Sequence, residues 1–182
     1  MKFAPCLIAA LLSCAPALAA DYQVEKGSTL SFTGTFQGES FEGYFGRFEA
    51  QIRYDSTNIE SSLFVVTVDL ASVSTGDADR DATLPDKEFF NVGEFPNAHF
   101  VTRQFRRSGD QVIAEGNLTI KGISKPVDLV VEFESRDAGG TMDISTRVNR
   151  LDFDIGSGEY ADTSTIGNEV TIKAHLELSP RL

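Results

Sequence analysis

The sequence predicts an all-β, antiparallel fold of about eight strands, arranged as a sandwich or a closed barrel, with one short helical insertion. First, apolar and polar residues alternate in short runs along most of the chain, as in strands with one buried face. Second, Gly109-Asp110 and Gly139-Gly140 fall between pairs of such runs, where hairpin turns are expected. Third, Ser72–Val101 interrupts the alternation with acidic residues and turn formers. A barrel does not need this insertion to fold, so we expect it to cover or shape a cavity.

The length of 182 residues predicts one folded domain, preceded by a signal peptide. Lys2 supplies a positive start, residues 3–12 an apolar core, and Ala-Leu-Ala at 17–19 a cleavage site with small residues. We therefore expect residues 1–19 to be removed and residues 20–182 to form the domain. Export of this kind places the protein in the periplasm, with release to the extracellular space as the alternative.

The same segment admits a second interpretation, because Cys14 follows small and apolar residues as in a lipoprotein signal. Cys6 and Cys14 are the two cysteines of the chain, and both precede residue 20. The domain would then lack disulfides and cysteine nucleophiles, although disulfides are permitted in an exported protein. Its stability must come from the apolar core.

The formal net charge of −11 argues against two classes of partner. Counterion release cannot drive binding of such a chain to nucleic acid. Anionic membrane surfaces repel it in the same way, and the apolar start of the chain is too short for a stable membrane span. The sequence leaves the oligomeric state open, with a homodimer as one option.

The strand-like runs differ in what they predict for each face. Phe45 and Phe48 have opposite parity within one run, which predicts a bulge at Gly46. The nearly continuous apolar run Leu63–Leu70 predicts a strand covered on both faces. A helix is expected near residues 78–90. The runs expected to form strands are residues 28–36, 41–54, 63–70, 98–105, 112–120, 127–133, 142–148 and 170–178.

The inward faces of these runs are rich in Phe, Val and Ile. An eight-stranded barrel has room either for packed side chains or for one ligand, and periodicity alone leaves both outcomes open. If a ligand is held, parity and the position of the insertion select a set of contacts. The candidate ligand-binding residues are Phe32, Phe36, Phe45, Phe48, Phe89, Phe90, Phe100, Met142 and Ile144.

Four segments between residues 22 and 178 carry motifs in a specific order and spacing. The most specific contains Ser72-x-x-Thr75-Gly76, Arg80-Asp81-x-x-Leu84, Phe89-Phe90 and Phe95-Pro96-x-x-x-Phe100. The other three are Gly43–Asp55, Gly116–Val127, and Asn149–Gly156 with Gly167–Val170. Together they resemble the YceI-like family of exported lipid- or polyisoprenoid-binding proteins, which have a lipocalin-like barrel.

The resemblance implies non-enzymatic binding or transport of an amphiphilic lipid, such as a polyisoprenoid, an isoprenoid quinone or a fatty acyl derivative. We expect no cofactor and no metal. Two alternatives stay open: a stress-related interaction protein whose barrel is filled, and an enzyme that modifies a lipid or quinone. The ligand-bearing barrel predicts a cavity, the filled barrel predicts none, and the enzyme predicts a role for His99.

Catalytic groups are sparse in the sequence. No Gly-x-Ser-x-Gly motif is present. His175 alternates with Ala174 and Leu176 and should face solvent, whereas His99 in the Phe-Pro segment could lie near the barrel mouth and meet a ligand head group.

The charged residues of the insertion have structural and ligand-binding interpretations. Asp77, Asp79, Asp81 and Asp86 do not have EF-hand spacing, and we favour helix capping over calcium binding. Arg80 with Asp81 should anchor the insertion, the alternative being contact with a ligand head group.

Two further groups of residues carry predictions. We expect Arg150 to pair with an acid, such as Asp152 or one across the barrel. Phe89, Phe90 and Phe95 should attach the insertion to the barrel or form an apolar lid, and both roles can hold together. The segment around Lys121 and Gly122 is predicted to connect two strands by a turn.

Overall fold

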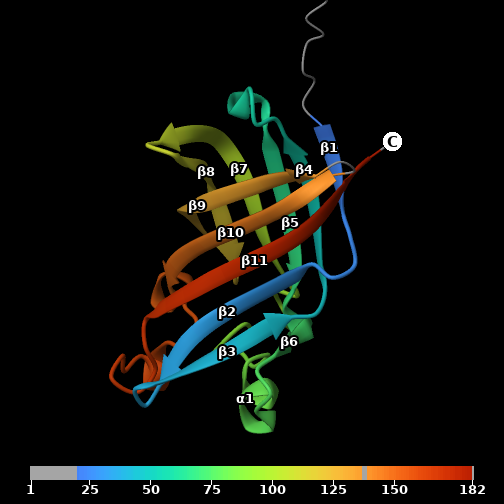
Figure 1. Cartoon of the computed structure of the whole chain (residues 1–182). Helices are drawn as coiled ribbons and strands as arrows, with labels where there is room; N and C mark the ends of the chain where they lie inside the picture. The colour runs from blue at the N-terminus through green and yellow to red at the C-terminus, as the bar shows by residue number, and fades with distance from the viewer. Residues whose placement is uncertain (1–19, 137–138, 182) are drawn as a thin grey trace, which may run out of the picture.

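The computed structural model describes residues 20–136 and 139–181 and shows an antiparallel barrel with one short α-helix (Figure 1). The predicted fold class is confirmed. Eight strands close into a ring because the last one pairs with the first. In ring order these strands are β1 (Ala20–Val24), β4 (Phe48–Tyr54), β5 (Leu63–Asp69), β7 (Asn97–Ser108), β8 (Gln111–Ile120), β9 (Ile123–Arg136), β10 (Gly139–Asn149) and β11 (Glu169–Pro180).

Three further strands extend the wall beyond this ring at one end. They are β2 (Thr29–Phe36), β3 (Glu39–Phe45) and the short β6 (Val73–Ser74). The hairpin β2–β3 continues from β11, and β3 pairs in turn with β6. Figure 1 shows this hairpin below β11, at the end of the molecule that carries α1. Because barrel diameter grows with the number of strands, the added hairpin widens this end, which we call the lower end.

Strand β11 changes partner along its length, and this change places the hairpin. Its first half pairs with β2 from Thr171 to His175, and its second half pairs with β1 from Leu178 to Pro180. Between the two partners, the backbone of Glu177 is satisfied locally. Its N–H donates to Ser28 Oγ at 3.0 Å, and its carbonyl accepts from Glu25 N–H at 2.8 Å.

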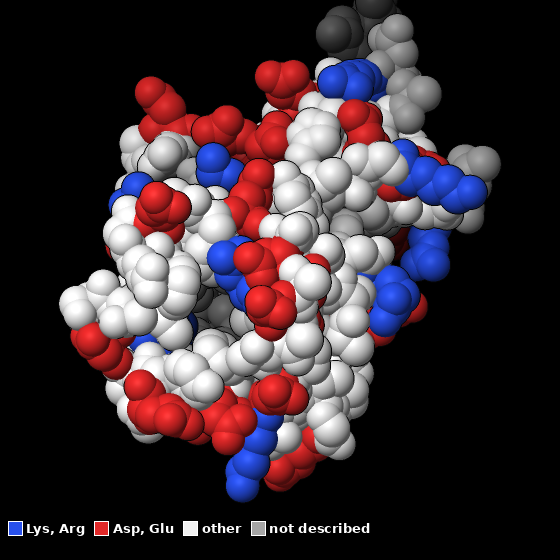
Figure 2. Space-filling view, turned by 90° about the horizontal axis from the view of Figure 1, so that it is seen from below, with Lys and Arg blue, Asp and Glu red and all other residues white. Residues whose placement is uncertain are grey.

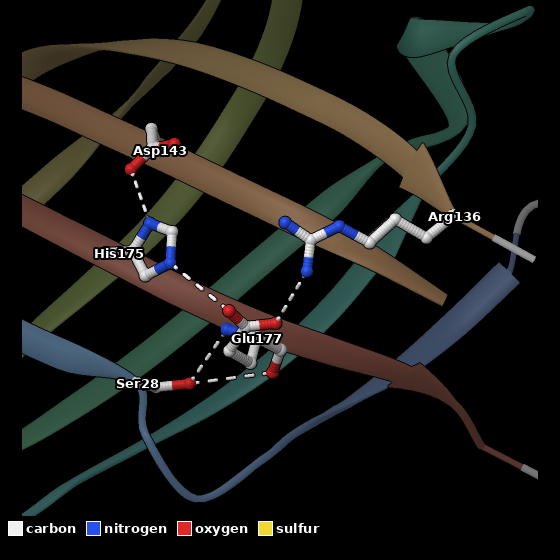
Figure 3. Close-up of polar contacts among 5 residues, drawn as sticks. All are labelled: Ser28, Arg136, Asp143, His175 and Glu177. Atoms are coloured by element: carbon white, nitrogen blue, oxygen red, sulfur yellow. Dashed lines mark hydrogen bonds and ion pairs between the residues drawn. The ribbon is translucent and has the colours of Figure 1, made fainter. Parts of the chain in front are cut away.

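A polar cluster covers the partner change on the outer face of the barrel (Figure 3). His175 contacts Asp143 of β10 through Nδ1 at 2.7 Å and Glu177 through Nε2 at 3.4 Å. Arg136 of β9 reaches the other oxygen of the Glu177 carboxylate at 3.3 Å. Asp143, and more weakly Glu177, raise the pKa of His175 above its ordinary value by stabilising the imidazolium. The cluster thus links β9, β10 and β11.

Within the described residues, two-residue turns join three pairs of neighbouring strands, β2–β3, β7–β8 and β8–β9. The turn between β8 and β9 is Lys121-Gly122, with φ of 50° and 73°. Positive φ at both central residues is typical of the type I′ turn, whose twist matches that of the flanking strands. The hairpin predicted at Gly109-Asp110 is confirmed, because Ser108 pairs with Gln111. Gly139 and Gly140 instead lie in β10, opposite Arg136 and Ser135, so the turn predicted there is wrong. The connection falls at residues 137–138, outside the described residues.

Three other expectations are corrected by the structure. Gly46 is not a bulge within one strand: the chain leaves β3 at Phe45 and begins β4 at Phe48, opposite the 3₁₀ turn η2 (Leu70–Ser72). The run from Leu63 is not covered on both faces, because Leu63 is 37% exposed on the outer face. The helix is shorter than expected, since α1 covers Ala78–Thr83 and Pro85 follows closely.

The pairing of His175 gives a pH-dependent stability. Because the folded-state pKa is raised, the contribution is complete below the unfolded value of about 6.5 and is lost as pH rises through the folded pKa. We expect His175→Gln to destabilise the protein at pH 5.5 and to have little effect at pH 8.5. The loss should stay below about 1 kcal/mol, because the cluster is half-exposed. Urea denaturation at both pH values measures this, and an equal loss at the two would contradict it.

Candidate functional site

A cavity of about 640 Å³ occupies the lower, widened half of the barrel. Its wall is almost entirely apolar and comes from the inward faces of the barrel strands and of the β2–β3 hairpin. The charged groups at its rim come mainly from α1, as Asp77, Asp79 and Arg80. Figure 2 views this end from below and shows a hollow in the surface with acidic and basic residues around it.

Eight of the nine residues predicted to contact a ligand line this cavity. They are Phe32, Phe36, Phe45, Phe48, Phe89, Phe90, Phe100 and Ile144. The far end of the Phe32 ring approaches Gly43 of the neighbouring strand, where a Cβ atom would be 2.3 Å from Cζ of the ring. This close approach keeps the ring against the wall. Phe36 is 40% exposed and lies at the rim.

Met142 does not line the cavity, although its parity is correct. It is fully buried in the upper half of the barrel, opposite Phe133 and Leu176. Parity predicts the face of a strand on which a residue lies but not its depth along the barrel. The sequence offers no signal for that depth, because the depth depends on where β11 changes its partner from β2 to β1.

Packed aromatic rings fill the upper half of the barrel and close the cavity from above. Tyr54 is central, with ring centroids 5.0 Å from Phe133 and 6.4 Å from both Phe64 and Phe105. Phe64 and Phe105 meet edge to face at 4.9 Å. This is the geometry that aromatic pairs prefer, and it leaves the lower half as the part of the barrel able to hold a ligand.

The insertion is held at the lower end by specific polar contacts. Asp77 caps α1 by accepting from Arg80 N–H at 2.9 Å, which agrees with the predicted capping role. Asp81 accepts from the N–H and hydroxyl of Thr75 at 2.6 and 2.7 Å, and these bonds lower its pKa. Arg80 does not pair with Asp81 as expected. Its guanidinium stacks 4.0 Å above the Phe41 ring.

The aromatic residues after α1 attach the insertion to the barrel. Phe89 packs on Tyr160 with ring centroids 5.0 Å apart, and Phe90 packs on Phe45 at 6.0 Å. Both are buried and line the cavity, so the two roles predicted for them, attachment and an apolar lid, coincide in the geometry. Phe95 has only the first role, since it packs against Gly122 of the β8–β9 turn.

Arg150 organises the loop that forms the other side of the rim, and its predicted pairing with an acid is wrong. It lies in the 3₁₀ turn η3 (Arg150–Phe153) and is 4% exposed. Burial lowers the pKa of its guanidinium, which keeps its charge because arginine does not lose its proton in proteins. All five N–H groups of the side chain donate to backbone carbonyls. These carbonyls belong to Ile155, Gly156, Tyr160, Ile166 and Gly167.

Lys121 ties the remaining rim segment to the barrel. Its side chain is only 7% exposed, and Nζ contacts the carbonyl of Lys87 at 3.3 Å and the carboxylate of Asp154 at 3.3 Å. The turn between β8 and β9 therefore joins the insertion to the loop that follows η3.

Neither histidine contributes to the cavity. His99 lies on the outer face of β7, 3.2 Å from Thr67 Oγ1, because its neighbour Phe100 faces inward. His175 belongs to the outer cluster. Within residues 20–136 and 139–181, no group of three His, Asp or Glu side chains is placed to hold a metal ion.

Several cavity residues share the parity of the predicted contacts but were not among them. The predicted set consists mainly of phenylalanines and leaves out smaller apolar residues on the same faces. They include Leu30, Ala50, Val66, Val68, Leu84 and Ile120. Arg150 was missed as a cavity residue because an arginine within an apolar wall has no periodic signal.

Residues 22–178 match the YceI-like domain. The chain belongs to the YceI-like family. A UPF0312 protein from Photorhabdus laumondii is 33% identical over 138 residues, which are 72% of each chain. The resemblance noted from the four segments is thereby confirmed.

Solved structures agree with the fold of this YceI-like protein. BcnA from Burkholderia cenocepacia is 31% identical, with a TM-score of 0.81 over 85% of this chain and 98% of that one. A polyisoprenoid binding domain from Saccharophagus degradans has a TM-score of 0.64 and 14% identity over 90% of this chain and 99% of that one. At 14% identity the second likeness concerns the fold alone. No helix in the described part of the chain is long and apolar enough to cross a bilayer.

The contacts of Arg150 predict a strict requirement for this side chain. Arg150→Met leaves five carbonyls without their donor, so we expect a loss of about 3 kcal/mol or more in the free energy of unfolding. Arg150→Lys should recover only part of the loss, because an ammonium group has three donors and cannot reach all five carbonyls. Urea denaturation of the three proteins measures this. Full stability of either variant would contradict the assigned role.

Proposed function

We propose that this YceI-like protein binds the apolar chain of an amphiphilic lipid in the lower half of its barrel, without catalysing a reaction. The chain would be a polyisoprenoid, an isoprenoid quinone or a fatty acyl derivative. One observation carries the proposal: a 640 Å³ cavity whose wall is apolar, closed above by packed aromatic rings and rimmed by charge. Binding sites for small molecules have this volume and this composition.

The energetics of such a wall favour long chains over compact polar molecules. Burying a CH₂ group contributes about 0.8 kcal/mol, so ten of them contribute roughly 8 kcal/mol before the entropic cost of association. Few polar contacts are then needed. The Saccharophagus degradans domain of the same fold is described as polyisoprenoid binding, which supports this class of ligand.

The two alternatives fit the geometry less well. A filled barrel would have no cavity of this size. An enzyme acting on a lipid would need acid–base or nucleophilic groups near the chain, and both histidines lie on the outer face. Binding and sequestration remain as the function that uses the cavity.

The proposed location is the periplasm, with residues 1–19 as the signal peptide. These residues lie outside those that the structure describes. In that compartment the protein would keep an apolar chain out of water, and the acidic surface would keep the complex soluble.

Filling the cavity should abolish binding. Ala50 lines the cavity from β4, so Ala50→Trp places an indole where the chain would lie. We expect the affinity for the methyl ester of cis-parinaric acid, measured by its fluorescence, to fall at least tenfold. Ala71→Trp, at an exposed position of η2, is the matched control and should bind normally. Equal affinity of Ala50→Trp and the unchanged protein would refute binding in this cavity.

A further inference from the structure

The barrel wall has a gap between β9 and β10. The two strands pair from Arg136 and Gly139 down to Val130 and Ser145, where the ladder ends. Both strands continue beyond this point, β9 back to Ile123 and β10 on to Asn149. Figure 1 shows the two ribbons separating with distance from the end where Arg136 pairs with Gly139. One side-chain bond crosses the gap, in which Thr146 Oγ1 donates to the carbonyl of Asp128 at 2.8 Å.

A groove of about 600 Å³ lies over this gap on the outside of the barrel. Outward residues of β9, β10 and β11 form its sides. Its base includes inward residues that also line the inner cavity, namely Val127, Thr146, Val148 and Phe153. The groove and the cavity are therefore separated by a single layer of side chains, three of which are apolar.

Lys125 shows that the wall is open here. It pairs with Leu118, which lines the cavity, and it has the parity of Val127 and Leu129, so its side chain leaves β9 on the inner face. Yet Lys125 is exposed and lines the outer groove. An ammonium group is costly in an apolar cavity, and the gap lets this one reach water.

The groove over the gap has an excess of basic side chains, whereas the opening beside α1 does not. The groove carries Lys125, Arg147 and Lys173 against Asp128 and Asp152. Asp128 is already paired with Arg106 at 3.1 Å, and Arg147 with Glu169 at 3.8 Å. No acid among the described residues forms an ion pair with Lys125 or Lys173.

The opening beside α1 has no such excess: its lining contains Asp77 and Asp79 with Arg80 and the buried Arg150, and Arg80 lies 4.0 Å from the Asp77 carboxylate. In a chain of net charge −11, the groove is therefore a favourable place for an anion.

We propose that the gap between β9 and β10 is a lateral portal, and that the outer groove holds the anionic head group of a bound amphiphile. The head group lies between Lys125 and Lys173, and the apolar chain passes Val127 and Val148 into the cavity. This inference rests on the proposed function, since it assigns the position and charge of the head group of the same ligand.

The test compares a charged probe with its neutral counterpart at pH 8. The unchanged protein and Lys125→Gln/Lys173→Gln are titrated with cis-parinaric acid and with its methyl ester. We expect the double variant to lose at least fivefold in affinity for the acid and to keep its affinity for the ester. Lys26→Gln/Lys87→Gln is the control: it removes two exposed charges away from the groove and should bind both probes normally.

The outcomes separate the two proposals. Two results would overturn the portal while leaving the cavity as the binding site, provided that the ester still binds. In the first, both double variants lose affinity for the acid. In the second, neither of them does. Equal loss of acid and ester in Lys125→Gln/Lys173→Gln also overturns the head-group assignment. If the unchanged protein binds neither probe, the proposed function fails, and the portal fails with it.

Discussion

The change of partner along β11 is the constraint on which the rest of the structure depends. Where β11 pairs with β1, eight strands close a narrow ring that aromatic side chains fill. Where it pairs with β2, a hairpin enters the wall and widens it. The same barrel is therefore solid above and hollow below. Ser28 and Glu25 satisfy the backbone of Glu177 between the two partners, so the change leaves no unpaired polar group there.

A widened barrel end needs a rim that does not collapse, and buried polar contacts supply it. Arg150 holds the segment up to Gly167 through carbonyls, and Lys121 joins that segment to the insertion. Asp81 fixes the start of α1 on Thr75. The cavity wall stays almost entirely apolar although Arg150 lines it, because backbone carbonyls of the rim accept all of its N–H groups. Rigidity and an apolar interior are thus obtained together, which suits a site that binds by exclusion of water.

The alternation of apolar residues was sufficient to predict antiparallel strands with one buried face, and its interruption predicted the helical insertion. Eight of the nine residues chosen as ligand contacts line the cavity. Phe32, Phe45 and Phe100 were assigned to the correct face because parity is a local property. Met142 shows where that argument ends, since depth along the barrel depends on which strands close the ring. Arg150 shows a second limit. Its partners are carbonyls, which every residue carries, so no acidic residue in the sequence could mark them.

The central claim is that the lower half of the barrel holds an apolar chain. Native mass spectrometry of the protein, purified without detergent from its own compartment, tests it most directly when the added mass is extracted and fragmented. The account predicts one lipid per chain, with a prenyl or acyl tail. A protein that carries no lipid and shows no change in Tm with added prenyl or acyl lipids would contradict it.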